Sequence, residues 1–456
     1  MKKFTRREVV IGLAAGAMGV AMPLRVAFGD NKDQDWLLSL DSSGAKIDGE
    51  GATILVSKPI TLRAGHFSNI SFSPADGYAG PGPIFMARDG LVTHDSVVVT
   101  GFTGPGCKIL SNQESGNSFV ATGKCSYSSN GNLRRTELTE SADLRFTSSI
   151  KVKDASIFNE GDFIWIGDGK FKIDSISGNE ISLMRGDLPN IISPKVFSGA
   201  YDKCSPGQYV TIDSDDKNGI RIGDGGYAWN IDTSKAEIEC SNNAWFGIFH
   251  YCKKYYGKQL IENITAIGNG YCNIGMGYMN SGTIKNCVSR NAGNNCIDIF
   301  ESKKDVNVTG NIASGAGVDG IFVGGNGETA RVYDNQVSDC HRLGILINAR
   351  KNPIQGVYVK NNKITRSGMN SLTLTGVEGG DIEGNTLDGS TIRQAIYLEQ
   401  RKGLNLSGQL NITNNHISNS AQGDISTNYS GYGTDTKARV MIQSTKKLTV
   451  SGIEGY

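Results

Sequence analysis

The sequence contains little proline and almost no net charge, and both features narrow the class of protein. Of 456 residues only 10 are proline, whereas 59 are glycine. High glycine without proline, and without a Gly-X-Y period, excludes collagen and argues against general disorder. The net formal charge is +1, so no basic field directs the chain towards a nucleic acid. We therefore expect short strands joined by many tight turns.

Cysteine patterns typical of metal sites or of a disulfide framework are also missing. The chain has nine cysteines, an odd number, with no C-x-x-C pair and no zinc-like spacing of cysteine and histidine. We predict no metal and no cofactor, and we expect the thiols to be small apolar core residues. The acidic run at 213–216 is the one candidate for a Ca²⁺ site, although such a run is usually a solvated turn.

The apolar run at positions 9–22 is too short and too rich in glycine for a stable membrane span. It follows Arg6 and Arg7, and small residues suited to cleavage end at Gly29. The segment resembles a twin-arginine export signal, with ordinary secretion as the alternative. We predict that residues 1–29 are removed. The mature protein would then be periplasmic or secreted by a bacterium, with no membrane attachment.

An internal repeat begins near residue 259 and predicts a solenoid. Short segments of similar sequence recur about every 24 residues, and an asparagine was aligned in each of them. These asparagines, which we expect to form a hydrogen-bonded ladder inside a turn, are Asn263, Asn286, Asn311, Asn335, Asn362, Asn385 and Asn415.

Each repeat also carries a second apolar strand between glycine-rich turns. Its alternation predicts two columns of inward side chains. The first column is Ile274, Ile297, Ile321, Ile345, Leu372 and Ile396, and the second is Met276, Ile299, Val323, Ile347, Leu374 and Leu398. Apolar residues at helical spacing are absent, which argues against helical and leucine-rich repeats.

The pattern N-x-hydrophobic followed by G-I-x-hydrophobic resembles the pectin-lyase-like superfamily. The resemblance implies an all-β fold, a right-handed parallel β-helix. The chain is also similar to tailspike-type polysaccharide depolymerases and to twin-arginine-exported β-helix proteins of exopolysaccharide clusters. The organisation that we expect is a signal peptide at 1–29, a cap and first coils at 30–143, an inserted β meander at 144–200, and the main β-helix with a C-terminal cap at 201–456.

Polar residues on the outward positions of the second strand are the candidates for chemistry. Two carboxyl groups within about 5–10 Å of each other, together with a cation, suffice for glycosidic cleavage. The predicted catalytic residues are Asp298, Asp319, Glu301 and His341, of which we expect Asp298 to be exposed. Arg342 and Arg393 are predicted to bind the substrate.

Aromatic residues crowd the segment 245–278, next to these polar positions. Sugar rings stack on aromatic faces, so Trp245, Tyr251, Tyr271 and Tyr278 are predicted to bind a glycan. The alternative is a buried aromatic edge that the insertion covers.

Together these features predict an exported enzyme that cleaves or trims a bacterial exopolysaccharide, with a glycoside hydrolase slightly favoured over a polysaccharide lyase. The catalytic motifs of polygalacturonases, mannuronan epimerases and pectate lyases are absent, so the resemblance supports polysaccharide as the ligand and no single reaction. The alternatives are a non-catalytic accessory protein of exopolysaccharide biosynthesis and a tailspike-like binding protein. The chain could be a monomer or a homotrimer.

Overall fold

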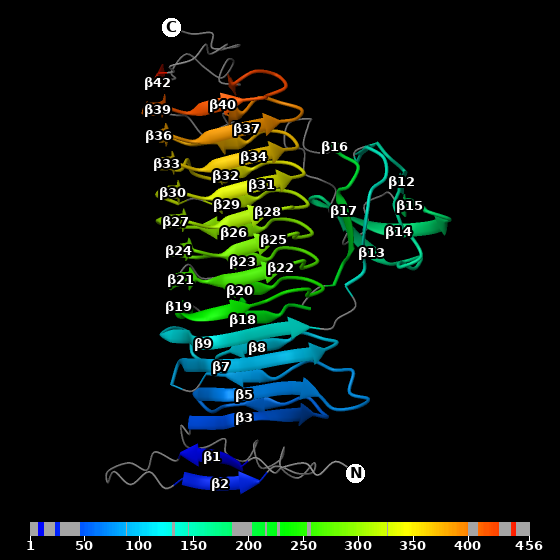
Figure 1. Cartoon of the computed structure of the whole chain (residues 1–456), viewed down its shortest axis with the longest axis vertical. Helices are drawn as coiled ribbons and strands as arrows, with labels where there is room; N and C mark the ends of the chain where they lie inside the picture. Colours follow the sequence, from blue (N-terminus) through cyan, green and yellow to red (C-terminus); the bar gives the residue numbers. More distant parts are fainter. Residues whose placement is uncertain are drawn as a thin grey trace.

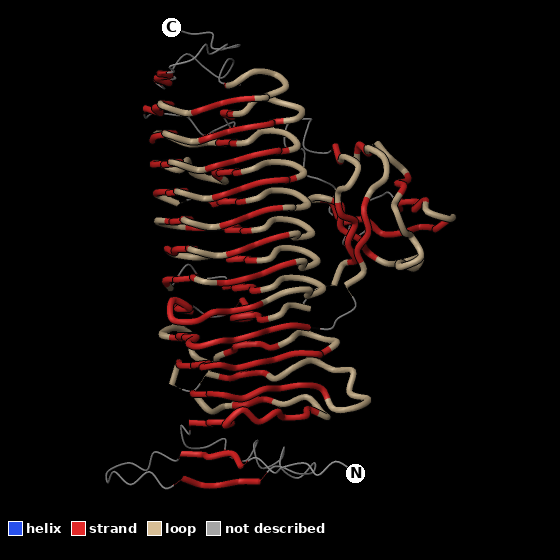
Figure 2. The backbone as a smooth tube through the Cα atoms, viewed as in Figure 1, coloured by secondary structure: helices blue, strands red, loops and turns tan. Residues whose placement is uncertain are grey.

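The computed structural model is a tall solenoid of stacked β-strands with a small β subdomain on one side (Figures 1 and 2). The described residues are 8–12, 23–27, 46–87, 89–129, 133–144, 146–184, 203–214, 217–225, 229–252, 257–325, 327–399, 409–427 and 439–443. Both major sheets run along the solenoid, with parallel pairing from coil to coil. The predicted right-handed parallel β-helix is confirmed.

The sheet that carries the G-I-x-hydrophobic strands, here called sheet B, has one strand from each coil. Its strands are β4 (Thr61–Leu62), β6 (Ile84–Met86), β8 (Cys107–Leu110), β18 (Ile220–Gly225), β20 (Ile248–Cys252), β23 (Ile274–Gly277), β26 (Ile297–Ser302), β29 (Ile321–Gly325), β32 (Ile345–Ala349), β35 (Leu372–Thr375), β38 (Ile396–Glu399) and β41 (Ile425–Thr427).

The other long sheet, sheet A, wraps around the opposite side of each coil. In its first half the strands are β1 (Glu8–Gly12), β2 (Pro23–Ala27), β3 (Lys46–Val56), β5 (His66–Pro74), β7 (Leu91–Phe102), β9 (Asn117–Ser129), β19 (Trp229–Glu239), β21 (Lys258–Glu262), β22 (Ile264–Ile267), β24 (Ser281–Lys285) and β25 (Val288–Arg290). In its second half they are β27 (Val306–Thr309), β28 (Ile312–Ser314), β30 (Thr329–Tyr333), β31 (Gln336–Cys340), β33 (Gly356–Lys360), β34 (Lys363–Ser367), β36 (Gly380–Glu383), β37 (Thr386–Ser390), β39 (Gln409–Thr413), β40 (His416–Ser418) and β42 (Arg439–Gln443).

The core between the two sheets is a stack of aliphatic columns. Ile274, Ile297 and Ile321 pair in register on β23, β26 and β29, and all three are buried. The same register continues through the later strands, so both predicted columns of sheet B are confirmed. β-Branched and leucine side chains suit this pleated interior because each packs on the equivalent residue of the next coil.

The asparagine ladder exists, but it is shorter than predicted. Five buried or part-buried residues form it: Asn311, Asn335, Asn362, Asn385 and Asn415. Asn263 and Asn286 were aligned one position too early, because they occupy the preceding turn residue, where φ is positive. Ile264 and Cys287 hold the ladder position in those coils. Asparagine tolerates the left-handed conformation, so the two roles look alike in sequence.

The inserted subdomain is larger than the 144–200 segment predicted from sequence. Its six-stranded sheet contains β10 (Arg135–Glu137), β17 (Tyr209–Ile212), β13 (Phe163–Ile166), β14 (Gly169–Ser177), β15 (Glu180–Met184) and β12 (Ser149–Lys151). A second, small sheet joins β11 (Ala142–Asp143) to β16 (Lys203–Cys204). The strands β10 and β17 pair with each other and close the sheet, so the subdomain begins near residue 135 and ends near 212. It has its own buried apolar core.

Three further expectations concern the ends of the chain. Within the predicted export segment, β1 and β2 pair with each other, and β1 also pairs with β3. Residues 28–45, where the predicted N-terminal cap begins, lie outside the described residues. At the other end β42 pairs with β39 and adds one strand to the stack. In the described part of the chain, no helix is long and apolar enough to cross a membrane.

Candidate functional site

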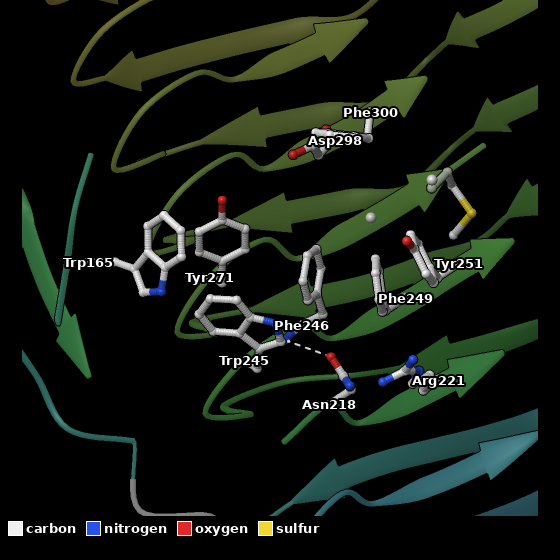
Figure 3. Close-up of a pocket in the computed structure, with 13 residues that line it drawn as sticks. Trp165, Asn218, Arg221, Trp245, Phe246, Phe249, Tyr251, Tyr271, Asp298 and Phe300 are labelled. Atoms are coloured by element: carbon white, nitrogen blue, oxygen red, sulfur yellow. Dashed lines mark hydrogen bonds between the residues drawn. The ribbon is translucent and has the colours of Figure 1, made fainter. Parts of the chain in front are cut away.

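A pocket of about 630 Å³ opens on the outer face of sheet B, beside the inserted subdomain (Figure 3). Its walls come from four successive strands, β18, β20, β23 and β26, from turns that precede them, and from Trp165 on β13 of the insertion. The predicted residues Trp245, Tyr251, Tyr271 and Asp298 all line it. The structure thus brings together four of the ten candidates from the sequence.

Two glycines create the space for this pocket. On sheet B the outward column runs from Phe249 through Gly275 to Asp298 in register. Gly277 pairs with Tyr251 two positions further along the same strands. A Cβ atom on Gly275 would lie 2.4 Å from the Phe246 ring, so that ring packs directly on the backbone of β23. Because β23 presents no outward side chain here, its two neighbours face each other across a gap.

Aromatic rings line one end of the pocket in stacked pairs. The rings of Trp245 and Tyr271 stack at 4.2 Å, and those of Phe246 and Phe249 also stack at 4.2 Å. Phe249 and Tyr251 continue the row at 5.9 Å. Trp245 and Phe246 are buried, whereas Phe249, Tyr251 and Tyr271 are partly exposed. The aromatic segment therefore combines the two predicted alternatives. Part of it is buried, and part of it faces the pocket.

Among the described residues that line the pocket, Asp298 is the one that carries a carboxyl group. It is 9% exposed, which contradicts the expectation that it would be exposed. Its Oδ2 accepts hydrogen bonds from Asn295 Nδ2 at 3.2 Å and from Cys272 Sγ at 3.4 Å. Its Oδ1 has no hydrogen-bond partner among the described residues. Burial raises the pKa of Asp298 to about 6, so the group exchanges its proton close to neutral pH.

Two arginines stand near the ends of the pocket. Arg221 lines it on β18, and its guanidinium carbon lies 5.9 Å from the centre of the Phe249 ring. Arg350 lies 3.9 Å from the centre of the exposed Phe300 ring, which lines the opposite end. The positive charge of Arg350 lowers the pKa of Asp298, against the larger effect of burial. Cations stacked on rings retain hydrogen-bond donors for an incoming ligand.

Asp319 and Arg342 do not have the catalytic and substrate-binding positions predicted for them. Asp319 is completely buried and accepts two hydrogen bonds from the Arg342 guanidinium, at 2.8 and 2.6 Å. Arg342 also forms an ion pair with Asp168 of the insertion. Burial raises the pKa of Asp319, and the arginine opposes that shift. The Asp319–Arg342 pair is a contact within the solenoid, and Arg342 links it to the insertion through Asp168.

The remaining candidates lie away from the pocket wall. Glu301 is buried at the end of β26, and His341 packs edge-on against Tyr209 of the insertion at 6.1 Å. Burial lowers the pKa of His341. Arg393 precedes β38, four strands beyond Asp298 in sheet B. Tyr278 contacts the pocket residues Tyr251 and Phe300 with its ring, at 5.5 and 5.9 Å, without lining the pocket itself.

Sequence reasoning missed several residues of the site. Trp165 comes from the insertion, and Phe300 was overlooked although it is two residues after Asp298 on the same strand face. Arg221 lies in the strand that resumes the solenoid after the insertion, where no repeat had been recognised. Extending the outward alternation to Phe300 would have found one of them. Nothing in the sequence indicates which insertion residue meets the solenoid.

The described residues contain no cluster of three His, Cys, Asp or Glu side chains that could hold a metal ion. In the candidate acidic run, Asp213 is engaged by the indole of Trp165 and by Lys170, while residues 215 and 216 lie outside the described part. Cys272, beside Asp298, is one of the buried cysteines of the described residues and forms no disulfide. Burial raises the pKa of Cys272 well above its ordinary value, so this thiol stays protonated.

No protein-family model and no curated protein matches the chain. Among solved structures, a double mutant of the periplasmic alginate epimerase AlgG is 12% identical, with a TM-score of 0.37 over 91% of this chain and 82% of that one. The A-module of the Azotobacter vinelandii mannuronan C-5 epimerase AlgE4 is 12% identical, with a TM-score of 0.35 over 91% of this chain and 96% of that one.

A third solved structure is the gp54 tailspike of Acinetobacter baumannii bacteriophage AP22, in complex with a capsular saccharide of its host. It is 15% identical, with a TM-score of 0.20 over 78% of this chain and 64% of that one. All three are right-handed parallel β-helix proteins, the fold that this chain adopts. Similarity at this level is too low to assign the activity of any of them to this chain.

Proposed function

We propose that this protein is exported and binds a polysaccharide on the outer face of sheet B, with Asp298 as the group that transfers a proton during cleavage. One observation supports this proposal above the others. A carboxyl group with a pKa of about 6, whose buried Oδ1 has no hydrogen-bond partner among the described residues, lies in the wall of a pocket lined with aromatic rings. A perturbed carboxyl in such a pocket is the usual arrangement of an acid–base catalyst.

The shape of the site suits an extended chain of sugars. Strands of a sheet lie about 4.8 Å apart, so the span from β18 to β26 is about 14 Å. Phe249, Tyr251 and Phe300 offer partly exposed or exposed ring faces along that span. The apolar C–H faces of sugars stack on such rings, while their hydroxyl groups need polar partners such as Asp298 and Arg221.

The arrangement favours a lyase-type cleavage over hydrolysis, which reverses the preference drawn from the sequence. Glycoside hydrolases generally use two carboxyl groups on either side of the scissile bond. Asp298 is the one carboxyl group among the described lining residues, and the expected second group, Asp319, is buried against Arg342. A lyase needs a base for the proton at C5 of a uronate and a cation for its carboxylate. Asp298 would supply the base, and Arg350, whose positive charge acts on Asp298 and whose guanidinium lies against Phe300, would supply the cation.

A second candidate is a binding protein without catalysis, such as an accessory factor for exopolysaccharide production. The low exposure of Asp298, at 9%, favours it, because a base must reach the reacting atom. In that case the Asp298 carboxyl would accept a hydrogen bond from a sugar hydroxyl and no proton would be exchanged.

The test is incubation of the protein from Asp30 onward with alginate, polygalacturonate and dextran, which represent two acidic polymers and one neutral polymer. We expect new reducing ends together with the ultraviolet absorbance of unsaturated uronates. Because Asp298 must be ionised to accept a proton, the rate should rise with pH through about 6. Asp298→Asn should lower it at least about 100-fold, and Thr373→Val, in the same outward column, is the matched control.

The other outcomes separate the alternatives. Reducing ends without the ultraviolet signal would identify a hydrolase and contradict the lyase assignment. Binding without either signal would support the accessory protein. If none of the three polymers bound, the polysaccharide proposal would be overturned for the acidic and neutral classes that they represent.

A further inference from the structure

One of the contacts between the insertion and the solenoid is the hairpin turn between β13 and β14. Asn294 on the solenoid donates a hydrogen bond from Nδ2 to the carbonyl of Gly167 at 2.9 Å. The next residue, Asp168, forms the ion pair with Arg342. A separate contact comes from Arg135, which donates to the carbonyl of Asn291 at 2.9 Å. The hairpin is therefore held by directed polar bonds along the turns that precede the strands of sheet B.

The ion pair is one part of a buried triad. Arg342, whose side chain is 13% exposed, lies between Asp319, which is fully buried, and Asp168, which is 39% exposed. Asp319 and Arg342 both belong to the solenoid, whereas Asp168 belongs to the insertion. Buried charges are tolerated only when they are paired and hydrogen-bonded. The Asp319 carboxylate therefore fixes Arg342, and Arg342 presents its remaining donors to the insertion.

The triad is also connected to Asp298. The backbone N–H of Asp319 donates to Asn295 Oδ1 at 3.0 Å, and the Nδ2 of the same amide donates to Asp298 Oδ2 at 3.2 Å. One side chain, Asn295, thus contacts both the carboxyl group of the pocket and the residue that anchors Arg342. A shift of the triad would be transmitted to the orientation of the Asp298 carboxyl group.

The hairpin places Trp165 in the pocket wall. Trp165 precedes Asp168 by three residues, and its ring lies 5.1 Å from that of Tyr271 and 5.8 Å from that of Trp245. Its indole N–H donates to Asp213 Oδ1 at 2.9 Å, which fixes the rotation of the ring. Figure 3 shows Trp165 facing Tyr271 across the side of the pocket that the insertion borders. The aromatic wall is incomplete without this residue.

We infer that Trp165 is a ligand-contacting residue supplied by the insertion, and that Asp168 and Arg342 are positioning residues that hold it against Tyr271. This inference rests on the proposed function, because the contacted ligand is the polysaccharide. The insertion then sets the width of the binding groove on one side. A chain of sugars bound over Phe249 and Tyr251 would contact the indole face of Trp165 at the edge of the groove.

Asp168 is the residue at which this inference can be tested without unfolding the solenoid. Replacing Arg342 would leave the buried Asp319 carboxylate unpaired, which is strongly destabilising. Asp168→Ala removes one of the contacts that hold the insertion and leaves the bonds between Arg342 and Asp319 in place. The matched control is Glu140→Ala, which removes an exposed ion pair with Lys151 inside the insertion.

The experiment measures binding of alginate, polygalacturonate and dextran together with the near-ultraviolet circular dichroism, which reports the packing of Trp165, Tyr271 and Trp245. We expect Trp165→Ala to weaken binding about tenfold and Asp168→Ala about threefold. Asp168→Ala should also reproduce part of the spectral change of Trp165→Ala. Glu140→Ala should leave both the affinity and the spectrum unchanged.

Two results would overturn the inference. If Asp168→Ala had the spectrum and affinity of the wild-type protein, Asp168 would not position Trp165. If Trp165→Ala bound as tightly as the wild-type protein, the indole would not contact the ligand. If the wild-type protein bound none of the polymers, the proposed function and the glycan contact would both fail, and the spectrum of Asp168→Ala would still decide the positioning role.

Discussion

The coils that carry the pocket differ from the coils that follow them both inside and outside the solenoid. In the later coils one internal turn position is asparagine five times in succession, whereas Ile264 and Cys287 occupy it in the pocket coils. On the outside, the pocket coils have Gly275 where the later coils have Phe322, Leu346 and Thr373.

The outer residues of the later coils cover one another. Phe322 and Leu346 pair in register in sheet B, and they pack with Leu343 and Met369 into a small buried cluster. At the positions equivalent to Gly275 these coils carry large side chains that pack on one another. In the later coils the repeated pattern therefore gives a continuous asparagine ladder and outward side chains that pack on one another. In the earlier coils Gly275 breaks the pattern, and the pocket lies beside it. The comparison shows that the pocket depends on the missing side chain at Gly275 as much as on the aromatic rings and Asp298 that line it.

The largest effect that we expect comes from breaking the ladder at Asn362→Ala. The Asn362 side chain donates to the carbonyl of Val332 and to Asn385, and it accepts two hydrogen bonds from Asn335. Removing the amide leaves several buried partners unsatisfied. The free energy of unfolding should fall by about 3 kcal/mol, since each such group costs about 1–3 kcal/mol.

Chemical denaturation measures this change, and the neighbouring residue provides the control. Asn361 is exposed and has a positive φ of 56°, so Asn361→Gly should change stability little. Binding at the pocket should be unaffected by either variant, because both lie in later coils. A loss of affinity in Asn362→Ala at a temperature where the protein stays folded would contradict the separation of the two regions.

An intermediate effect is expected from filling the cavity at Gly277. Its Cβ position has neighbours at 3.3 and 3.4 Å, the backbone of His250 and the ring of Tyr251, so alanine fits with a slight adjustment. A leucine at this position would project into the space between Tyr251 and Phe300. We expect Gly277→Ala to reduce polysaccharide affinity at most slightly and Gly277→Leu to reduce it about tenfold. Equal affinities for the two variants, measured by titration, would place the ligand elsewhere.

The repeat made most of the solenoid predictable. Alternation fixes which face of each strand is buried, and Ile297 and Ile321 could be placed in one column because a shift of one residue would have turned them outward. The off-by-one error at Asn263 and Asn286 has a physical reason. Two consecutive turn positions accept asparagine, one for its positive φ and the other for its side-chain hydrogen bonds. Sequence alone does not distinguish them.

The site was less predictable because it depends on contacts between distant parts of the chain. Trp165 and Tyr271 are far apart in sequence, and no periodicity relates the insertion to the coils. The burial of Asp319 was not predictable because a buried aspartate paired with an arginine has the same local sequence as an exposed one before a glycine. Asp298 was correctly placed on the outward face, but its burial depends on Cys272 and Asn295, which approach it from neighbouring turns.

The smallest effect is expected from extending the ladder by one coil with Cys287→Asn. Cys287 already has ladder geometry, since its N–H donates to Asn311 Oδ1 at 2.9 Å and its thiol points at the carbonyl of Ile261, 3.9 Å away. In the ladder, the equivalent carbonyl of Ile284 accepts from Asn311 Nδ2 at 3.0 Å. An asparagine amide would make both of the corresponding bonds, and each is worth at least about 0.5 kcal/mol net. We expect the free energy of unfolding to rise by about 1 kcal/mol with unchanged polysaccharide affinity, whereas a fall would mean that the pocket coils are too narrow at this turn to accept the repeat.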